Sequence, residues 1–139
     1  RFRNVTGVQT CALPISDASS ELMMTRTGAG DPNFNLRQDP AFMIRRHNTA
    51  NHTFVSIVEP HGLYDISKEV TVGYRSNIVS LKLLADNEMI SVVEIVTADN
   101  KTLLFAVNNQ TGKSENKFDY RGEQYVFTGN YLLKLITNK

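Results

Sequence analysis

The chain has 139 residues, of which 41% are hydrophobic and 21% are charged, and its formal net charge is +1. This length suits one domain with a sizeable core. The balanced charge gives no electrostatic reason to expect nucleic acid or an anionic membrane as a partner. No apolar run approaches the roughly 20 residues that a membrane-spanning helix needs, so we expect no membrane partner.

Residues 1–16 form a segment of a different kind. The stretch Val5–Ile15 is similar to the translated sequence of a common sequencing adapter, so we treat residues 1–16 as a non-native extension and residues 17–139 as the domain. The alternatives are a genuine first strand or a degraded signal peptide, whose apolar stretch would be too short. Excluding the segment removes Arg1, Arg3 and Cys11. The remainder has 13 basic against 14 acidic residues, a net charge of −1, and no cysteine for a disulfide, a nucleophile or a metal site.

In the first half of the domain, β-branched and aromatic residues alternate with turn formers. Strands are predicted over residues 21–26, 41–46 and 53–58, the last ended by Pro60 and a turn at His61–Gly62. Between the first two, Gly28, Gly30 and two prolines predict a loop over 27–40.

The second half is predicted to be a meander. Turn residues at 86–87, 99–100, 121–122 and 129–130, and a loop over 108–114 built on Gly112, separate strands over 78–84, 90–97, 102–107, 117–120, 124–128 and 131–136. The pair Asp99-Asn100 has the composition of a two-residue hairpin turn. No stretch has a helical period with capping residues. Strands spaced by about ten residues predict an all-β fold, an antiparallel β-sandwich.

Three segments together carry a resemblance to a known family. They are Thr25–Arg37 (TRTGAGDPNFNLR), Pro40–Arg45 (PAFMIR) and Phe54–Gly62 (FVSIVEPHG). They resemble the C-terminal region of alginate and oligoalginate lyases of the heparinase II/III-like superfamily, polysaccharide lyase family 17. The resemblance implies the C-terminal β-sandwich part of a bacterial, periplasmic or secreted enzyme. It also implies missing partners upstream, a catalytic α/α-toroid and the first part of the sandwich, and an anionic polysaccharide, alginate, as substrate.

Cleavage of a uronate polymer by β-elimination needs a group that neutralises the carboxylate, a base and an acid. The chain contains Tyr and His residues, but no spacing ties them into a site. Tyr120, Tyr125 and Tyr131 are interpreted as packing residues. His52 and His61 lie up to about 30 Å apart on an extended chain, so they are not expected to share a metal. The resemblance implies that catalytic and zinc-binding residues lie upstream. We therefore expect no catalytic residue, metal site or cofactor here.

The long loop holds the candidate substrate-binding residues, Asn35 and Arg37. Both can donate hydrogen bonds to a carboxylate, Arg in a bidentate manner, and long loops on rigid scaffolds often carry function. The alternative is a purely structural crossover. The basic stretch Arg37–Arg46 could face an anionic sugar, but solvated surface is the favoured interpretation, because an isolated basic cluster is commonly solvated. Two other functions stay open. One is the same domain in a heparin or other glycosaminoglycan lyase, and the other is a stand-alone carbohydrate-binding module, which the lack of Trp disfavours.

Overall fold

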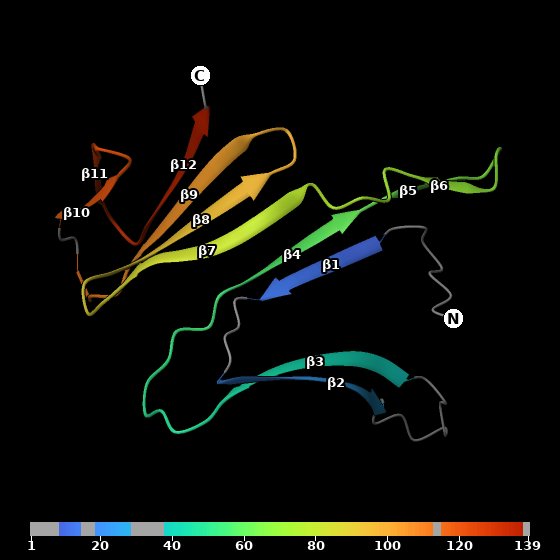
Figure 1. Cartoon of the computed structure of the whole chain (residues 1–139), viewed down its shortest axis with the longest axis horizontal. Coiled ribbons are helices and arrows are strands. Elements are labelled where there is room, and N and C mark those ends of the chain that lie inside the picture. The colour runs from blue at the N-terminus through green and yellow to red at the C-terminus, as the bar shows by residue number, and fades with distance from the viewer. Residues whose placement is uncertain (1–8, 15–18, 29–37, 113–114, 138–139) are drawn as a thin grey trace. The chain divides into compact units, whose positions relative to one another are not determined.

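The computed structural model describes residues 9–14, 19–28, 38–112 and 115–137 (Figure 1). Throughout this part of the chain the regular elements are β-strands, and every strand pair is antiparallel, which confirms the all-β prediction. The described residues contain no helix long and apolar enough to cross a membrane. The strands are β1 (Gln9–Pro14), β2 (Ser20–Gly28), β3 (Gln38–Arg46), β4 (Ser56–His61), β5 (Leu63–Asp65), β6 (Val70–Val72), β7 (Ile78–Asp86), β8 (Ile90–Thr97), β9 (Lys101–Asn108), β10 (Glu115–Tyr120), β11 (Glu123–Thr128) and β12 (Tyr131–Thr137).

Two compact units make up the chain. One unit is Ser16–Thr53, and the other combines Arg1–Ile15 with Phe54–Lys139. The larger unit contains a four-stranded sheet in the order β12-β9-β8-β7 and the two-stranded pairs β10-β11, β1-β4 and β5-β6. The smaller unit contains the hairpin β2-β3.

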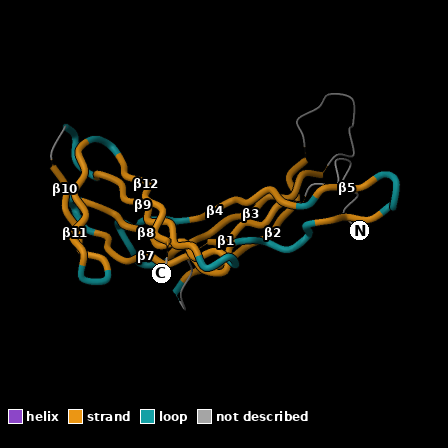
Figure 2. The backbone as a smooth tube through the Cα atoms, turned by 90° about the horizontal axis from the view of Figure 1, so that it is seen from above, coloured by secondary structure: helices purple, strands orange, loops and turns teal. Residues whose placement is uncertain are grey.

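The hydrophobic core lies between the four-stranded sheet and the β10-β11 hairpin, which form two layers (Figure 2). Strand β10 shows the responsible pattern, because its exposed Glu115, Lys117 and Asp119 alternate with buried residues along the strand. Two antiparallel layers around one core are the predicted β-sandwich. The buried cluster consists of Ile90, Val92, Leu104, Ala106, Phe118, Tyr120 and Phe127.

The turns of the meander follow from local sequence. Arg121 and Gly122 have φ angles of 50° and 83°, and the flanking Tyr120 and Glu123 are paired, so this is the two-residue hairpin predicted there. The predicted two-residue turn Asp99-Asn100 is instead a three-residue loop between Thr97 and Lys101. Its last residue, Asn100, has a φ of 58° and donates its N–H to the Thr97 carbonyl over 3.0 Å. Asparagine tolerates this left-handed conformation better than most residues.

Strand β4 corrects one boundary. The predicted strand over 53–58 was to end at Pro60, but β4 begins at Ser56 and continues through Pro60 to His61. Proline lacks an N–H donor, yet it is tolerated in a strand that is paired on one side only, and among the described strands β4 pairs with β1 alone. The hairpin β5-β6 was not predicted, since its strands have three residues each. Pairing of β1 with β4 is what an open strand edge accepts readily, and the non-native origin of residues 1–16 stays a prediction.

The smaller unit corrects another boundary. The predicted loop over 27–40 is shorter, because the β2-β3 ladder runs from Ser20 opposite Arg46 to Gly28 opposite Gln38. Pro40 is accommodated in this two-stranded ribbon for the same reason as Pro60 in β4. The middle of the predicted loop, with Asn35 and Arg37, lies outside the described residues.

Candidate functional site

A cleft of about 650 Å³ opens between the β7-β8 turn and the start of β10. Its lining combines the apolar side chains of Met89 and Ile90 with the amide of Asn116, which is only 2% exposed. Both walls come from residues next to turns, so the sandwich itself positions them. The remaining lining residues are Asn87, Glu88, Glu115 and Lys117.

Asparagine side chains fix the turn on one side of this cleft. The Asn87 Oδ1 accepts hydrogen bonds from the backbone N–H of Met89 at 2.8 Å and of Ile90 at 3.0 Å. The Asn109 amide donates to the Asn87 carbonyl at 2.7 Å and to the Ser91 Oγ at 2.9 Å. Short polar side chains that bond to nearby backbone in this way stabilise turns. The turn is therefore held by the loop that follows β9.

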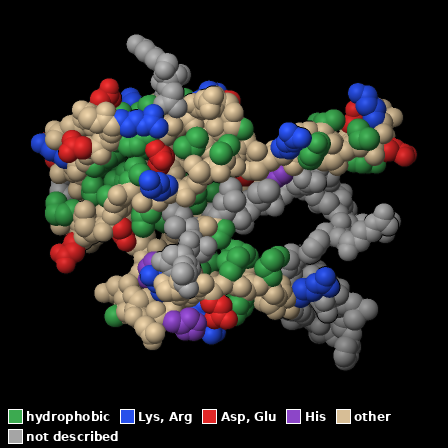
Figure 3. Space-filling model, viewed as in Figure 1, with side chains coloured by type: hydrophobic (Ala, Val, Ile, Leu, Met, Phe, Trp, Pro, Cys, Tyr) green, Lys and Arg blue, Asp and Glu red, His purple; other side chains and the backbone are tan. Residues whose placement is uncertain are grey.

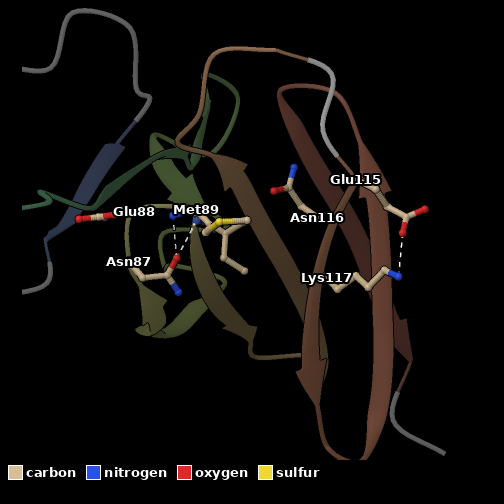
Figure 4. A pocket seen from close by; sticks show the side chains of 7 residues that line it. Asn87, Glu88, Met89, Glu115, Asn116 and Lys117 are labelled. Atoms are coloured by element: carbon tan, nitrogen blue, oxygen red, sulfur yellow. Dashed lines mark hydrogen bonds and ion pairs between the residues drawn. The ribbon is translucent and has the colours of Figure 1, made fainter.

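The charges of the cleft do not suit an anionic sugar. In Figure 4 Met89 and Asn116 point toward one another, whereas Glu88, Glu115 and Lys117 point away from the space between them. The Lys117 ammonium lies 2.7 Å from the Glu115 carboxylate, so its charge is already balanced. Among its described lining residues, the cleft can hold a small neutral group against an amide, but the one cation, Lys117, is already paired and does not neutralise a uronate carboxylate.

The tyrosines interpreted as packing residues are largely structural. Tyr120 and Tyr125 contact one another edge to face in the core, and Tyr125 stacks on Phe118 at 5.4 Å. The Tyr120 hydroxyl donates a hydrogen bond to Glu94. Burial, and next the Glu94 carboxylate, raises the pKa of Tyr120, which keeps its hydroxyl protonated. Tyr131 differs, because it is 64% exposed; its ring centroid lies 6.0 Å from that of Phe105.

Glu59 ties β4 to the beginning of β7. Its carboxylate accepts a hydrogen bond from the Ser76 hydroxyl and two from the Asn77 backbone N–H, at 2.9 and 3.1 Å. The Ser76 bond is the largest of the contributions that lower the pKa of Glu59, to which the nearby His61 adds a smaller one. A carboxylate held by several donors stays ionised, so Glu59 has the chemistry of a structural anchor rather than of a proton donor.

His52 and His61, the two histidines considered as metal ligands, do not lie in a metal-binding group of described residues. Among the described residues, no group of three His, Cys, Asp or Glu side chains could hold a metal ion. His61 ends β4, and His52 precedes that strand. The third histidine, His47, lies 3.1 Å from the Glu21 carboxylate, which Arg45 also approaches at 3.5 Å.

Sequence reasoning missed the cleft. Its residues come from the β7-β8 turn and the start of β10. Asn87 and Asn109 were placed in a predicted turn and a predicted loop, and Asn116 fell in no predicted element. The cross-chain bonds of Asn109 to Asn87 and Ser91 leave no pattern in the sequence, because they join residues 18 to 22 positions apart.

No family model matches the chain. It is similar to two lyases. It is 36% identical over 88 residues to the exo-oligoalginate lyase of Saccharophagus degradans and 30% identical over 117 residues to the alginate lyase of Stenotrophomonas maltophilia. These alignments cover 63% and 84% of this chain but only 12% and 16% of the two enzymes, so the chain spans less than a fifth of their length.

Proposed function

We propose that residues 17–139 are the non-catalytic C-terminal β-sandwich portion of a bacterial alginate or oligoalginate lyase that cleaves uronate polymers by β-elimination. The observation that carries the proposal is the similarity to an alginate lyase over 84% of this chain but 16% of that enzyme. A part of this size leaves most of the enzyme elsewhere. The catalytic toroid and the first sandwich part are the proposed missing partners, and alginate is the proposed substrate.

The chemistry of the described side chains is consistent with a non-catalytic role. The tyrosine hydroxyl inside the core is bonded to Glu94, and the Glu59 carboxylate is bonded to backbone and hydroxyl donors. Neither group is placed to exchange a proton with a bound sugar. The finer assignment to the heparinase II/III-like superfamily, to the periplasm or the cell exterior, and to a part without cofactor is proposed on the three resembling segments alone.

The loop between β2 and β3 is the proposed contact with substrate. The ladder from Ser20 to Gly28 and from Gln38 to Arg46 holds both ends of this loop together. Asn35 and Arg37 belong to the sequence between these strands and lie outside the described residues; the proposal rests on their chemistry, because a guanidinium can bind a uronate carboxylate in a bidentate manner.

An activity assay tests the non-catalytic role. The purified chain and the longer protein encoded by the same reading frame are each incubated with polymannuronate, polyguluronate and heparin, and the absorbance of the unsaturated product is followed. We expect product only from the longer protein and only with the alginate polymers. Turnover by the chain alone would show that it is catalytic. Cleavage of heparin but not alginate would assign the domain to a glycosaminoglycan lyase.

The loop proposal is tested in the longer enzyme with Arg37→Ala. We expect a higher KM or a lower kcat on oligoalginate with a nearly unchanged melting temperature. Arg75→Ala, which removes an arginine that packs over Tyr74 between β6 and β7, is the matched control and should leave both constants unchanged. Unchanged activity of Arg37→Ala, or activity lost only together with stability, would make the loop scaffolding.

A further inference from the structure

The four-stranded sheet has a second face, opposite the one that packs on β10-β11. In an antiparallel sheet, residues directly opposite one another point to the same side. The registers pair Leu83 with Val93, Val93 with Phe105 and Phe105 with Leu133, so these four residues share this face. We call it the outer face. Together with their neighbours at alternate positions, its members are Leu81, Leu83, Val93, Ile95, Leu103, Phe105, Val107, Tyr131, Leu133 and Leu135.

The composition of the outer face is that of a covered surface. The central rows of this face carry only aliphatic or aromatic side chains, whereas Ser91 and Asp86 share the row of Val107 and Tyr131 at one end and Thr97, Lys101 and Thr137 lie at the other. Charged residues stand only toward its ends, where Asp86 accepts a hydrogen bond from Ser91 at 2.7 Å and Lys101 pairs with Asp99 at 2.5 Å. A sheet with one face in water alternates apolar and polar residues, as β10 does.

Nevertheless, the outer face is open along β12. Leu133 and Leu135 are 58% and 49% exposed, as is much of Tyr131. Figure 3 shows hydrophobic side chains at the surface in the region of β10 to β12, including beside the β10-β11 hairpin, which packs on the opposite face of the sheet. The openness of the outer face itself follows from these exposed residues of β12, which forms the edge of the sheet (Figure 1). Large exposed apolar patches of this kind mark interaction surfaces.

We infer that the outer face, with β12 at its margin, is the docking surface for an apolar layer supplied by the part of the same longer protein that lies outside these 139 residues. The inference rests on the proposed function, because it needs that longer protein. The length of the relatives argues for this occupant, since the matched region is 12% and 16% of them and most of each enzyme is left to supply a covering layer. Because the face lacks charges at its centre, its partner must be apolar rather than an anionic sugar.

Cysteine labelling tests the inference. The changes Leu133→Cys and Leu135→Cys are made singly in a Cys11→Ser background, both in the 139-residue chain and in the longer protein. Val126→Cys is the matched control. Val126 is 47% exposed on the solvent-exposed side of the β10-β11 hairpin, where it lies opposite Lys117, and it is not part of the outer face of the four-stranded sheet. Rates of thiol alkylation are measured for the folded proteins at several concentrations.

We expect rapid labelling at all three positions in the 139-residue chain. In the longer protein, the alkylation rates at residues 133 and 135 should fall by about tenfold or more, because a buried thiol reacts only when the protein opens locally. The alkylation rate at residue 126 should stay high. Equal rates at residue 133 in both proteins would overturn the inference and leave the proposed function intact. Protection in the 139-residue chain that grows with concentration would show that a second copy is the occupant, which also overturns it. A reading frame that encodes no longer protein would refute the proposed function itself.

Discussion

Leu104→Ala is the sharpest test of the core. Leu104 lies on β9 with 0% of its side chain exposed, within the cluster formed by the four-stranded sheet and the β10-β11 hairpin. Shortening it removes apolar contacts with both layers at once. Leu133→Ala is the matched comparison, since Leu133 is on the neighbouring strand β12 but on the open outer face.

The magnitude follows from burial. At about 0.8 kcal/mol per carbon removed, the lost transfer energy of Leu104→Ala is about 2.4 kcal/mol. The cavity left by incomplete relaxation brings the expected total to about 3–4 kcal/mol. With a urea m value of about 1.7 kcal/mol/M, the unfolding midpoint should fall by about 2 M. Leu133→Ala should cost about 0.5 kcal/mol or less in this chain, as exposed substitutions do.

Equilibrium unfolding in urea, followed by far-UV circular dichroism and tyrosine fluorescence, measures both variants. An unchanged m value would show that the midpoints report stability. If Leu104→Ala cost less than about 1 kcal/mol, or no more than Leu133→Ala, the sheet and the hairpin would not share the core described above.

Three further results are expected. Tyr120→Phe removes the hydroxyl that donates to the Glu94 carboxylate and should lower the free energy of unfolding by about 1–2 kcal/mol. Because folding raises the pKa of Tyr120 from 10.0, wild-type stability should also fall as pH rises through the folded pKa. A Tyr120→Phe variant whose stability falls equally at alkaline pH would refute this. Glu59 has its pKa lowered from 4.5, so its contribution is present above that value and lost as pH falls through the folded pKa; the melting temperature of Glu59→Gln should therefore vary less with pH in acid than that of the wild type. Removal of residues 1–16, in a chain that begins at Asp17, should leave thermal unfolding nearly unchanged, and a loss of several kcal/mol would show that this segment is integral.

Local sequence patterns were enough to predict the four-stranded sheet and the β10-β11 hairpin. The β-branched run of β8, the alternation in β9 and the Arg121-Gly122 turn depend on neighbouring residues, and each matches its prediction closely. The errors at Pro40 and Pro60 have one physical source. Proline ends a strand only where its missing N–H is needed, and sequence does not reveal which side of a strand lacks a partner.

The candidate site was less predictable. The amide-lined cleft depends on Asn109 reaching Asn87 across two turns, and no local pattern encodes such a bond. The outer face was missed for a different reason. Its residues look like ordinary core residues in the sequence, and only the register shows that they face away from the β10-β11 hairpin.

The pairing of β12 with β9 has a consequence for folding kinetics. Strands β7, β8 and β9 are joined by short turns, and such hairpins form in about 1–10 μs. Strand β12 also pairs with β9, but the β10-β11 hairpin separates these two strands in the sequence. Because β12 is synthesised after β10 and β11, one edge of β9 stays open until β12 has formed and paired with it. A chain that stops at Asn130 should therefore form the early hairpins but associate through the vacant edge of β9, which sedimentation of the truncated chain would detect.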